Sequence, residues 1–130
     1  MGIEERRERE KARRRQEILG AARRLFLEKG FFDARMEEIA EGAELATGTP
    51  YLYFQNKAEI YATLCEEGLD ILNGLLSEAF TGGGSYEERL RAPGRTYLGF
   101  YAGYTSYYDI LSSVDMGFKQ IGLSSPLEKR

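Results

Sequence analysis

The chain has 130 residues, enough for one small domain followed by part of a second, and its 18 basic and 21 acidic side chains give a net charge of −3. That balance does not by itself indicate a nucleic-acid partner. Without histidine and with one cysteine, Cys65, the chain lacks histidine nucleophiles, histidine metal sites and internal disulfides, so we expect no cofactor, no metal, no enzymatic activity and a reducing, cytoplasmic environment. No apolar run approaches the roughly 20 residues of a membrane span, so no membrane partner is expected.

The first fifteen residues are highly charged and have no apolar periodicity. One interpretation is a solvated helix with Glu–Arg pairs along its surface. The other is a basic arm that touches DNA phosphates or enters a minor groove. The basic charge is concentrated upstream, because residues 1–29 carry ten basic and six acidic side chains, whereas residues 30–62 carry two and six.

A helix is predicted from the charged run to Lys29, and glycine at Gly30 should end it as a left-handed cap. Phe31 and Phe32 then offer an aromatic anchor for a junction of three helices. The apolar side of this helix is formed by Ile18, Leu19, Ala22, Leu25 and Phe26.

Residues 36–57 predict a helix-turn-helix. In the first short helix, Met36, Ile39, Ala40 and Ala43 share one apolar face. Leu45 should lie in the turn as an apolar plug. A second short helix should begin at Ala46 or Thr47, with Leu52 and Phe54 packing back onto the first. Such a unit typically holds its second helix in the major groove of DNA.

At these residues the run from Ile18 to Lys57 resembles the DNA-binding domain of the TetR family of bacterial repressors. The resemblance implies an all-α chain in which residues 1–56 form a three-helix DNA-binding domain with a basic N-terminal arm. Residues 57–130 would form an incomplete helical domain for ligand binding and dimerisation. The matching residues are Ala21-Ala22, Leu25-Phe26, Glu28-Lys29-Gly30-Phe31, Ile39-Ala40-Glu41, Gly48-Thr49, Tyr51, Tyr53-Phe54 and Lys57.

The resemblance also implies the residues that contact DNA. Threonine hydroxyls would meet base edges or phosphates, a glycine would allow close backbone approach, and tyrosine hydroxyls and cations would meet phosphates. Lys57 would also bring a helix N-terminus to the DNA backbone. The predicted DNA-binding residues are Arg35, Thr47, Gly48, Thr49, Tyr51, Tyr53 and Lys57.

Three residues depart from the family pattern. Glu44 replaces a turn glycine and must adopt a positive φ or change the turn. Ala46 replaces a serine, which removes an N-cap worth about 1 kcal/mol. Pro50 is acceptable only if the second helix begins near Gly48 or Thr49. Since no Lys or Arg lies between residues 36 and 55 either, we expect weakened DNA binding on an intact fold.

Beyond residue 57 the sequence predicts a long helix to about Phe80, apolar over most of its circumference, which should pack against more than one neighbour. Cys65 should be a small core residue of this helix. A glycine-rich loop follows at residues 81–85, and then a helix over residues 86–102 that Pro93 should kink or begin. A second aromatic segment contains Tyr104, Tyr107 and Tyr108, and residues 116–123 form a looser apolar segment.

An aromatic group in the C-terminal half suggests a pocket for a small apolar or aromatic effector. The alternative for each residue is plain helix packing. The candidate ligand-binding residues are Leu64, Gly68, Tyr97, Phe100, Tyr101, Tyr104, Tyr107 and Tyr108.

The predicted function is therefore a TetR-like repressor that binds an operator as a homodimer and is released by a small molecule. The chain ends before the two further helices that form the dimer interface in the family, which predicts a weak dimer or one of another kind. The alternative function is a helical interaction or ligand-binding module that has kept the fold and lost operator binding.

Overall fold

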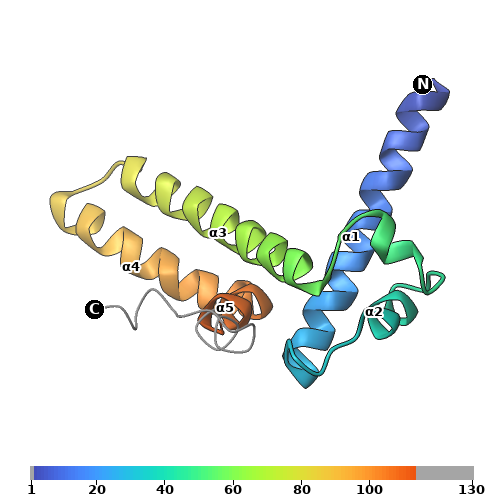
Figure 1. Ribbon diagram of the computed structural model, residues 1–130. Coiled ribbons are helices and arrows are strands. Elements are labelled where there is room, and N and C mark those ends of the chain that lie inside the picture. The colour runs from blue at the N-terminus through green and yellow to red at the C-terminus, as the bar shows by residue number, and fades with distance from the viewer. Residues whose placement is uncertain (1, 114–130) are drawn as a thin grey trace.

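The computed structural model describes residues 2–113, in which all regular structure is helical, as predicted (Figure 1). Between the helices lie residues 30–35, 43–48, 53–56 and 82–85, and Tyr104. The predicted apolar segment at residues 116–123 lies outside the described residues. The elements are α1 Ile3–Lys29, α2 Met36–Gly42, the 3-10 helix η1 Thr49–Leu52, α3 Lys57–Thr81, α4 Tyr86–Gly103 and α5 Thr105–Ser112.

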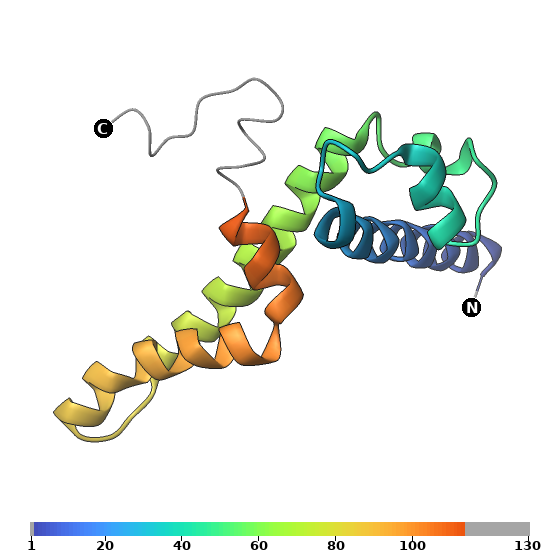
Figure 2. The same ribbon diagram turned by 90° about the horizontal axis from the view of Figure 1, so that it is seen from below.

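The helices form two units joined through α3. In the first unit α2 and η1 lie on one side of α1, and the first turns of α1 extend past them (Figures 1 and 2). In the second unit α4 runs back beside α3, and α5 packs against α3 close to α1. The N-terminal half of α3 is therefore the place where both units meet.

The charged N-terminal run is the first half of one continuous 27-residue helix, α1. Its side chains are exposed up to residue 17, and pairs such as Arg13 with Glu10 at 2.7 Å connect successive turns. The charged run is therefore a solvent-exposed helix, as one of the two interpretations predicted. At the other end, α1 ends at Gly30 as predicted, with a φ of 86° and its N–H donated to the Phe26 carbonyl. Its ψ of 161° lies outside the left-handed helical region, so the left-handed form of the cap is wrong.

One apolar core joins α1, α2, α3 and α5. Phe26, Phe31 and Tyr61 form its aromatic centre, with ring centroids 5.5–5.7 Å apart. The prediction that Phe32 shares this anchoring role is wrong, because its side chain is 68% exposed. The buried members of the core include Ile18, Leu19, Ala22, Phe26, Phe31, Met36, Ile39, Phe54, Ile60, Leu64 and Ile110.

The long helix α3 begins with a side-chain cap, since Asn56 accepts a hydrogen bond from the Glu59 N–H at 2.9 Å. Its first half packs against α1 and α5, as predicted, and buries Ile60 and Leu64. Cys65 packs against the core, and burial raises the pKa of its thiol to about 11. The second half packs against α4 and leaves Phe80 67% exposed.

Helix α4 runs through Pro93. The prediction that this proline marks the true start is wrong, because Ser85 caps the helix by accepting a hydrogen bond from the Glu88 N–H at 3.2 Å. Within residues 2–113, no helix combines the length and the apolarity that a membrane crossing demands.

Candidate nucleic-acid interface

The turn between α2 and η1 is closed by a glycine-type motif built on a glutamate. Glu44 has φ 59°, its N–H donates to the Glu41 carbonyl at 3.0 Å, and the Leu45 N–H donates to the Ala40 carbonyl at 2.9 Å. This pair of bonds is the Schellman arrangement. Leu45 packs against the core, so both the apolar plug and the positive φ at Glu44 are confirmed.

The second helix of the helix-turn-helix is reduced to the single 3-10 turn η1, and the prediction that it begins at Ala46 or Thr47 is wrong. Ala46 has no side-chain oxygen that could cap a helix beginning there, and Pro50 lacks the backbone N–H that a longer helix needs at that position. Pro50 instead occupies the first turn, where proline is tolerated, and it is buried. Thr47 therefore lies in the turn before η1 rather than on it.

The residues around η1 divide into an exposed and a buried set. Tyr51 is 53% exposed and Leu52 is 82% exposed, whereas Phe54 is buried under the guanidinium of Arg15 at 5.2 Å. The prediction that Leu52 packs inward is wrong, because the short turn directs it away from α2. Tyr53 is only partly exposed.

The backbone turn before η1 is itself open to solvent. Thr47 and Gly48 are exposed, and Thr49 is partly so. A Cβ on Gly48 would meet nothing within 4 Å, so the protein itself does not require glycine there, and space is left for a partner's backbone. The threonine hydroxyls and the tyrosine hydroxyls thus remain candidates for DNA contact.

Lys57 lies differently from its predicted role at a phosphate. Its Nζ donates to the carbonyl oxygens of Phe31, Phe32 and Ala34 at 2.7, 2.8 and 3.0 Å. An ammonium has three donors, so these bonds use all of them. Burial lowers the pKa of Lys57, an effect that the charge of Asp33 opposes. Lys57 therefore fixes the loop between α1 and α2 to the start of α3, a role that sequence reasoning missed.

Arg35 is exposed at the N-terminal boundary of α2 and makes no side-chain cap there. It lines an open hollow together with Lys29, Asp33, Glu37 and Glu38. Lys29 pairs with Glu38, and this hydrogen bond lowers the pKa of Glu38, although burial opposes it. Arg35 thus shares this hollow with three carboxylates and one lysine, a net negative surrounding that weakens it as a phosphate ligand.

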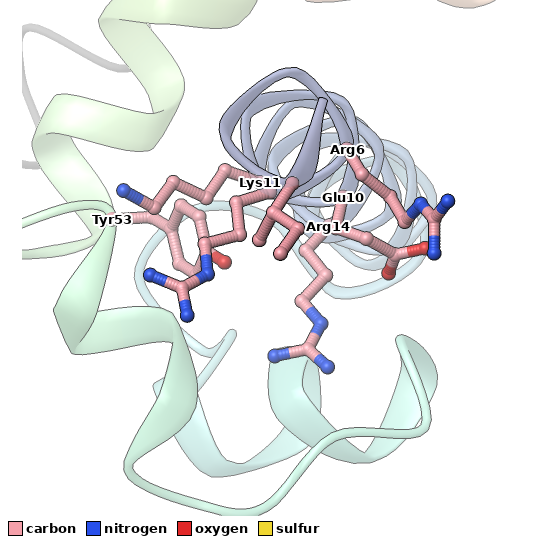
Figure 3. Close-up of a pocket in the computed structure, with 7 residues that line it drawn as sticks. Arg6, Glu10, Lys11, Arg14 and Tyr53 are labelled. Atoms are coloured by element: carbon pink, nitrogen blue, oxygen red, sulfur yellow. The ribbon is translucent and has the colours of Figure 1, made fainter. Parts of the chain in front are cut away.

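Basic side chains instead gather between α1 and η1. An open hollow of about 320 Å³ separates the first turns of α1 from Tyr53, and a second of about 470 Å³ adjoins it (Figure 3). The excess of basic residues upstream signalled these cations, but not that they face η1. The first hollow is lined by Ile3, Arg6, Arg7, Glu10, Lys11, Arg14 and Tyr53, and the second by Glu8, Lys11, Ala12, Arg15, Leu52 and Tyr53.

Three of the candidate ligand residues lie in the packing between α3 and α5. Leu64 is fully buried in the core, and a Cβ on Gly68 would lie 3.2 Å from Leu111 Cδ1. The hydroxyl of Tyr107 donates to Glu67 Oε2 at 3.1 Å, and the guanidinium of Arg23 lies 4.6 Å from the centre of its ring. Burial raises the pKa of Tyr107. In this structure Leu64, Gly68 and Tyr107 hold helices together.

The other aromatic candidates contact one another. Tyr108 meets Tyr101 edge to face at 4.7 Å between ring centroids and Tyr97 at 6.3 Å, and Phe100 stacks on Tyr104 at 5.8 Å. Phe100 is buried, whereas Tyr97, Tyr101 and Tyr104 are exposed and Tyr108, on α5, is partly buried. An effector pocket among them remains a prediction.

Comparison with known proteins connects this geometry to a family. Residues 18–64 match the family described as bacterial regulatory proteins, tetR family. Over 87 residues the chain is 30% identical to the HTH-type transcriptional activator FasR of Mycolicibacterium smegmatis, covering 67% of this chain and 40% of FasR. Over 60 residues it is 38% identical to the uncharacterized HTH-type transcriptional regulator YfiR of Bacillus subtilis, covering 46% of this chain and 29% of YfiR.

Solved structures agree with the sequence matches. A TetR-like transcriptional regulator from Rhodococcus sp. RHA1 superposes with a TM-score of 0.73 and 29% identity, covering 84% of this chain and 60% of that one. The fatty acid degradation regulator FadR from Bacillus halodurans gives 0.65 and 22%, covering 82% and 61%. The chain thus spans 29–40% of the length of these curated relatives and about 60% of these solved structures.

Proposed function

Because the chain belongs to the TetR family of bacterial regulatory proteins, we propose that it binds an operator and regulates transcription through the exposed turn at residues 47–53. The observation that carries this proposal is the helix-turn-helix itself. The backbone hydrogen bonds at Glu44 close its turn, and Leu45 packs into the core beneath it. Residues 47–53, which we call the reading segment, are therefore held rigidly on the surface. A rigidly held reading segment is what major-groove recognition requires.

In this proposal the hydroxyl groups around η1 are the reading groups. Thr47 and Thr49 meet base edges or nearby phosphates, and Tyr51 and Tyr53 donate to phosphate oxygens. Gly48 allows the backbone to approach the DNA. Arg35 contributes a peripheral contact, since it shares its hollow with three carboxylates.

We further propose that the regulator is a repressor whose operator affinity falls when an elongated, mainly apolar effector binds beside α3, α4 and α5. Such a ligand would act by favouring one arrangement of α5 over another. The contacts of Tyr107 support this route, because its ring lies against Arg23 of α1 while its hydroxyl is bonded to Glu67 of α3. A movement of α5 would therefore shift its contact with α1 and so change the position of the DNA-binding helices.

Operator binding by a two-fold dimer is part of the same proposal. Apolar side chains remain exposed along the parts of α3 and α4 that lie away from the DNA-binding unit, and large exposed apolar surfaces mark interfaces. The exposed side chains include Leu69, Phe80, Tyr86, Leu90 and Leu98.

The experiment is a gel-shift and footprinting assay with DNA flanking the protein's own gene, beside random duplex of equal length. We expect a protected site bound more tightly than random DNA. Thr49→Ala should change the preference among operator variants, while Glu87→Ala, far from η1 on α4, should leave it unchanged. Equal binding to operator and random DNA at low salt would overturn the regulator in favour of an interaction module.

A further inference from the structure

The helix α1 carries a row of cations in line with its buried face. With 3.6 residues per turn, Arg7, Lys11, Arg14 and Ile18 are spaced by four, three and four residues and lie along one side of the helix. From Ile18 onward this side is buried in the core. Before Ile18 the same side is exposed and basic.

The row of cations faces the reading segment. Arg7, Lys11 and Arg14 line a hollow whose other wall is Tyr53, and Arg6 and Glu10 line it as well. Figure 3 shows Lys11 extending to the side of Tyr53, Arg14 pointing below the helix, and Arg6 and Glu10 on the other side. Arg15 extends the row toward η1, where it lines the adjoining hollow and covers the Phe54 ring. The four cations of the row, Arg7, Lys11, Arg14 and Arg15, therefore line hollows that end at Tyr53.

Other cations near η1 are engaged elsewhere. No Lys or Arg occurs at residues 36–55, and the three donors of Lys57 are used by backbone carbonyls. Arg35 shares its hollow with three carboxylates. In the row itself, Lys11 has Glu8 at 3.6 Å, but both side chains are more than half exposed, and such pairs contribute little. The row is thus the main source of positive charge beside the reading segment.

We propose that Arg7, Lys11, Arg14 and Arg15, with the hydroxyl of Tyr53, form a phosphate-binding row that holds the DNA backbone next to the reading segment; this inference rests on the proposed function. From Arg7 to Arg15 the helix rises about 12 Å, which equals the axial rise of about three to four phosphates of one DNA strand. Contacts to phosphates fix register and supply affinity without reading sequence. DNA binding is accordingly divided between a neutral reading turn and a basic helix.

The test compares two triple variants of the full chain with equal loss of charge. Arg7→Gln/Lys11→Gln/Arg14→Gln removes three of the four cations of the row, and Arg9→Gln/Arg13→Gln/Arg24→Gln removes three cations of the same helix that line neither hollow. Circular dichroism is used to check that both variants keep the helix content of the wild type. Affinity for operator duplex and for random duplex is measured between 50 and 200 mM salt.

The row variant should lose about 2.7 units per bound chain from the slope of log K against log salt, since each phosphate contact contributes about 0.9. Its ratio of operator to random affinity should stay that of the wild type. The control variant should lose less than about 1 unit.

Equal slope losses in both variants, or an unchanged slope in the row variant, would overturn the phosphate-binding row while leaving the regulator intact. Wild-type protein that binds random DNA as tightly as operator, with the slope loss confined to the row variant, would overturn the regulator and support the row. Absence of any DNA binding by the wild type would overturn both.

Discussion

Replacing Lys57 with methionine distinguishes a structural lysine from a DNA-contacting one. Methionine keeps a flexible apolar stem of similar length but lacks the ammonium, whose Nζ lies 4.8 Å and 5.6 Å from the ring centres of Phe31 and Phe32. It removes three hydrogen bonds and the charge. The carbonyls of Phe31 and Ala34 accept these bonds in a partly buried environment, whereas that of Phe32 is exposed.

The expected loss in the free energy of unfolding follows from those three carbonyl oxygens. A hydrogen bond to a charged group contributes about 1.5–3 kcal/mol when buried, and less when water can replace the donor. Two partly buried carbonyls and one exposed carbonyl therefore give a loss of about 2–4 kcal/mol in the free energy of unfolding. For a protein stabilised by about 5–15 kcal/mol in total, this is a large fraction.

Urea denaturation followed by circular dichroism measures this loss, with Lys29→Met as the matched control. Lys29 also carries one positive charge near the same loop, but it pairs with Glu38 at the surface, so its replacement should change the midpoint far less. In DNA titrations below the melting temperature, Lys57→Met should keep the wild-type salt slope. An unchanged urea midpoint together with a slope reduced by about 0.9 would show that Lys57 binds a phosphate and would refute the role assigned to the three carbonyls.

Three further predictions concern packing, pH and the turn. Gly74→Ala should raise the free energy of unfolding by about 1 kcal/mol in urea melts, because helix propensity improves and a Cβ there meets nothing within 4 Å. The free energy of unfolding of Gly68→Ala should be lower than that of Gly74→Ala by about 1 kcal/mol or more, because the Cβ at residue 68 would lie 3.2 Å from Leu111. Equal gains in both variants would contradict the close contact of α3 with α5. Burial raises the pKa of Tyr61 from 10.0 to about 12, so the folded state holds this proton more tightly, and the stability it contributes is present below pH 10 and lost as pH rises toward 12. Urea midpoints at pH 8 and pH 11 should differ less in Tyr61→Phe than in the wild type. Identical differences in the two proteins would show that Tyr61 does not cause the loss of stability at high pH. Glu44→Gly should raise the thermal midpoint, because φ 59° costs glutamate about 1 kcal/mol more than glycine, whereas a lowered midpoint would indicate that the Glu44 side chain stabilises the turn.

The sequence was sufficient wherever one residue type has one strong conformational preference. Gly30 predicted the end of α1, and the turn position held by Glu44 predicted either a positive φ or a changed turn, of which the structure shows the positive φ. The apolar spacing of α1 and of the first half of α3 predicted their buried faces, because burial follows the helical period directly. The helix boundaries near residues 57 and 81 followed from the same periodicity and the glycine-rich loop.

Contacts between distant segments were not predictable in the same way. Lys57 reads as a surface cation at a helix start, and only the folded chain brings the carbonyls of residues 31–34 within reach of its Nζ. Phe32 and Leu52 are apolar, yet both are exposed, because their neighbours Phe31 and Phe54 occupy the available core positions. Composition indicates that a side chain is apolar, but the geometry of the adjoining turn decides which of two neighbours is buried.

The shortened η1 and the basic first half of α1 are connected through Tyr53. A full second helix would carry its own side chains to the DNA over several turns, whereas η1 offers one turn that bears no basic residue. A neutral turn has little electrostatic attraction for DNA, and non-specific affinity comes almost entirely from cations at phosphates. The cations that line the hollow opposite Tyr53 are therefore placed where the loss can be offset without altering which bases are read. If that is the arrangement on DNA, substitutions in η1 should act mainly on sequence preference and substitutions in the row mainly on salt dependence, with nearly additive effects of the two.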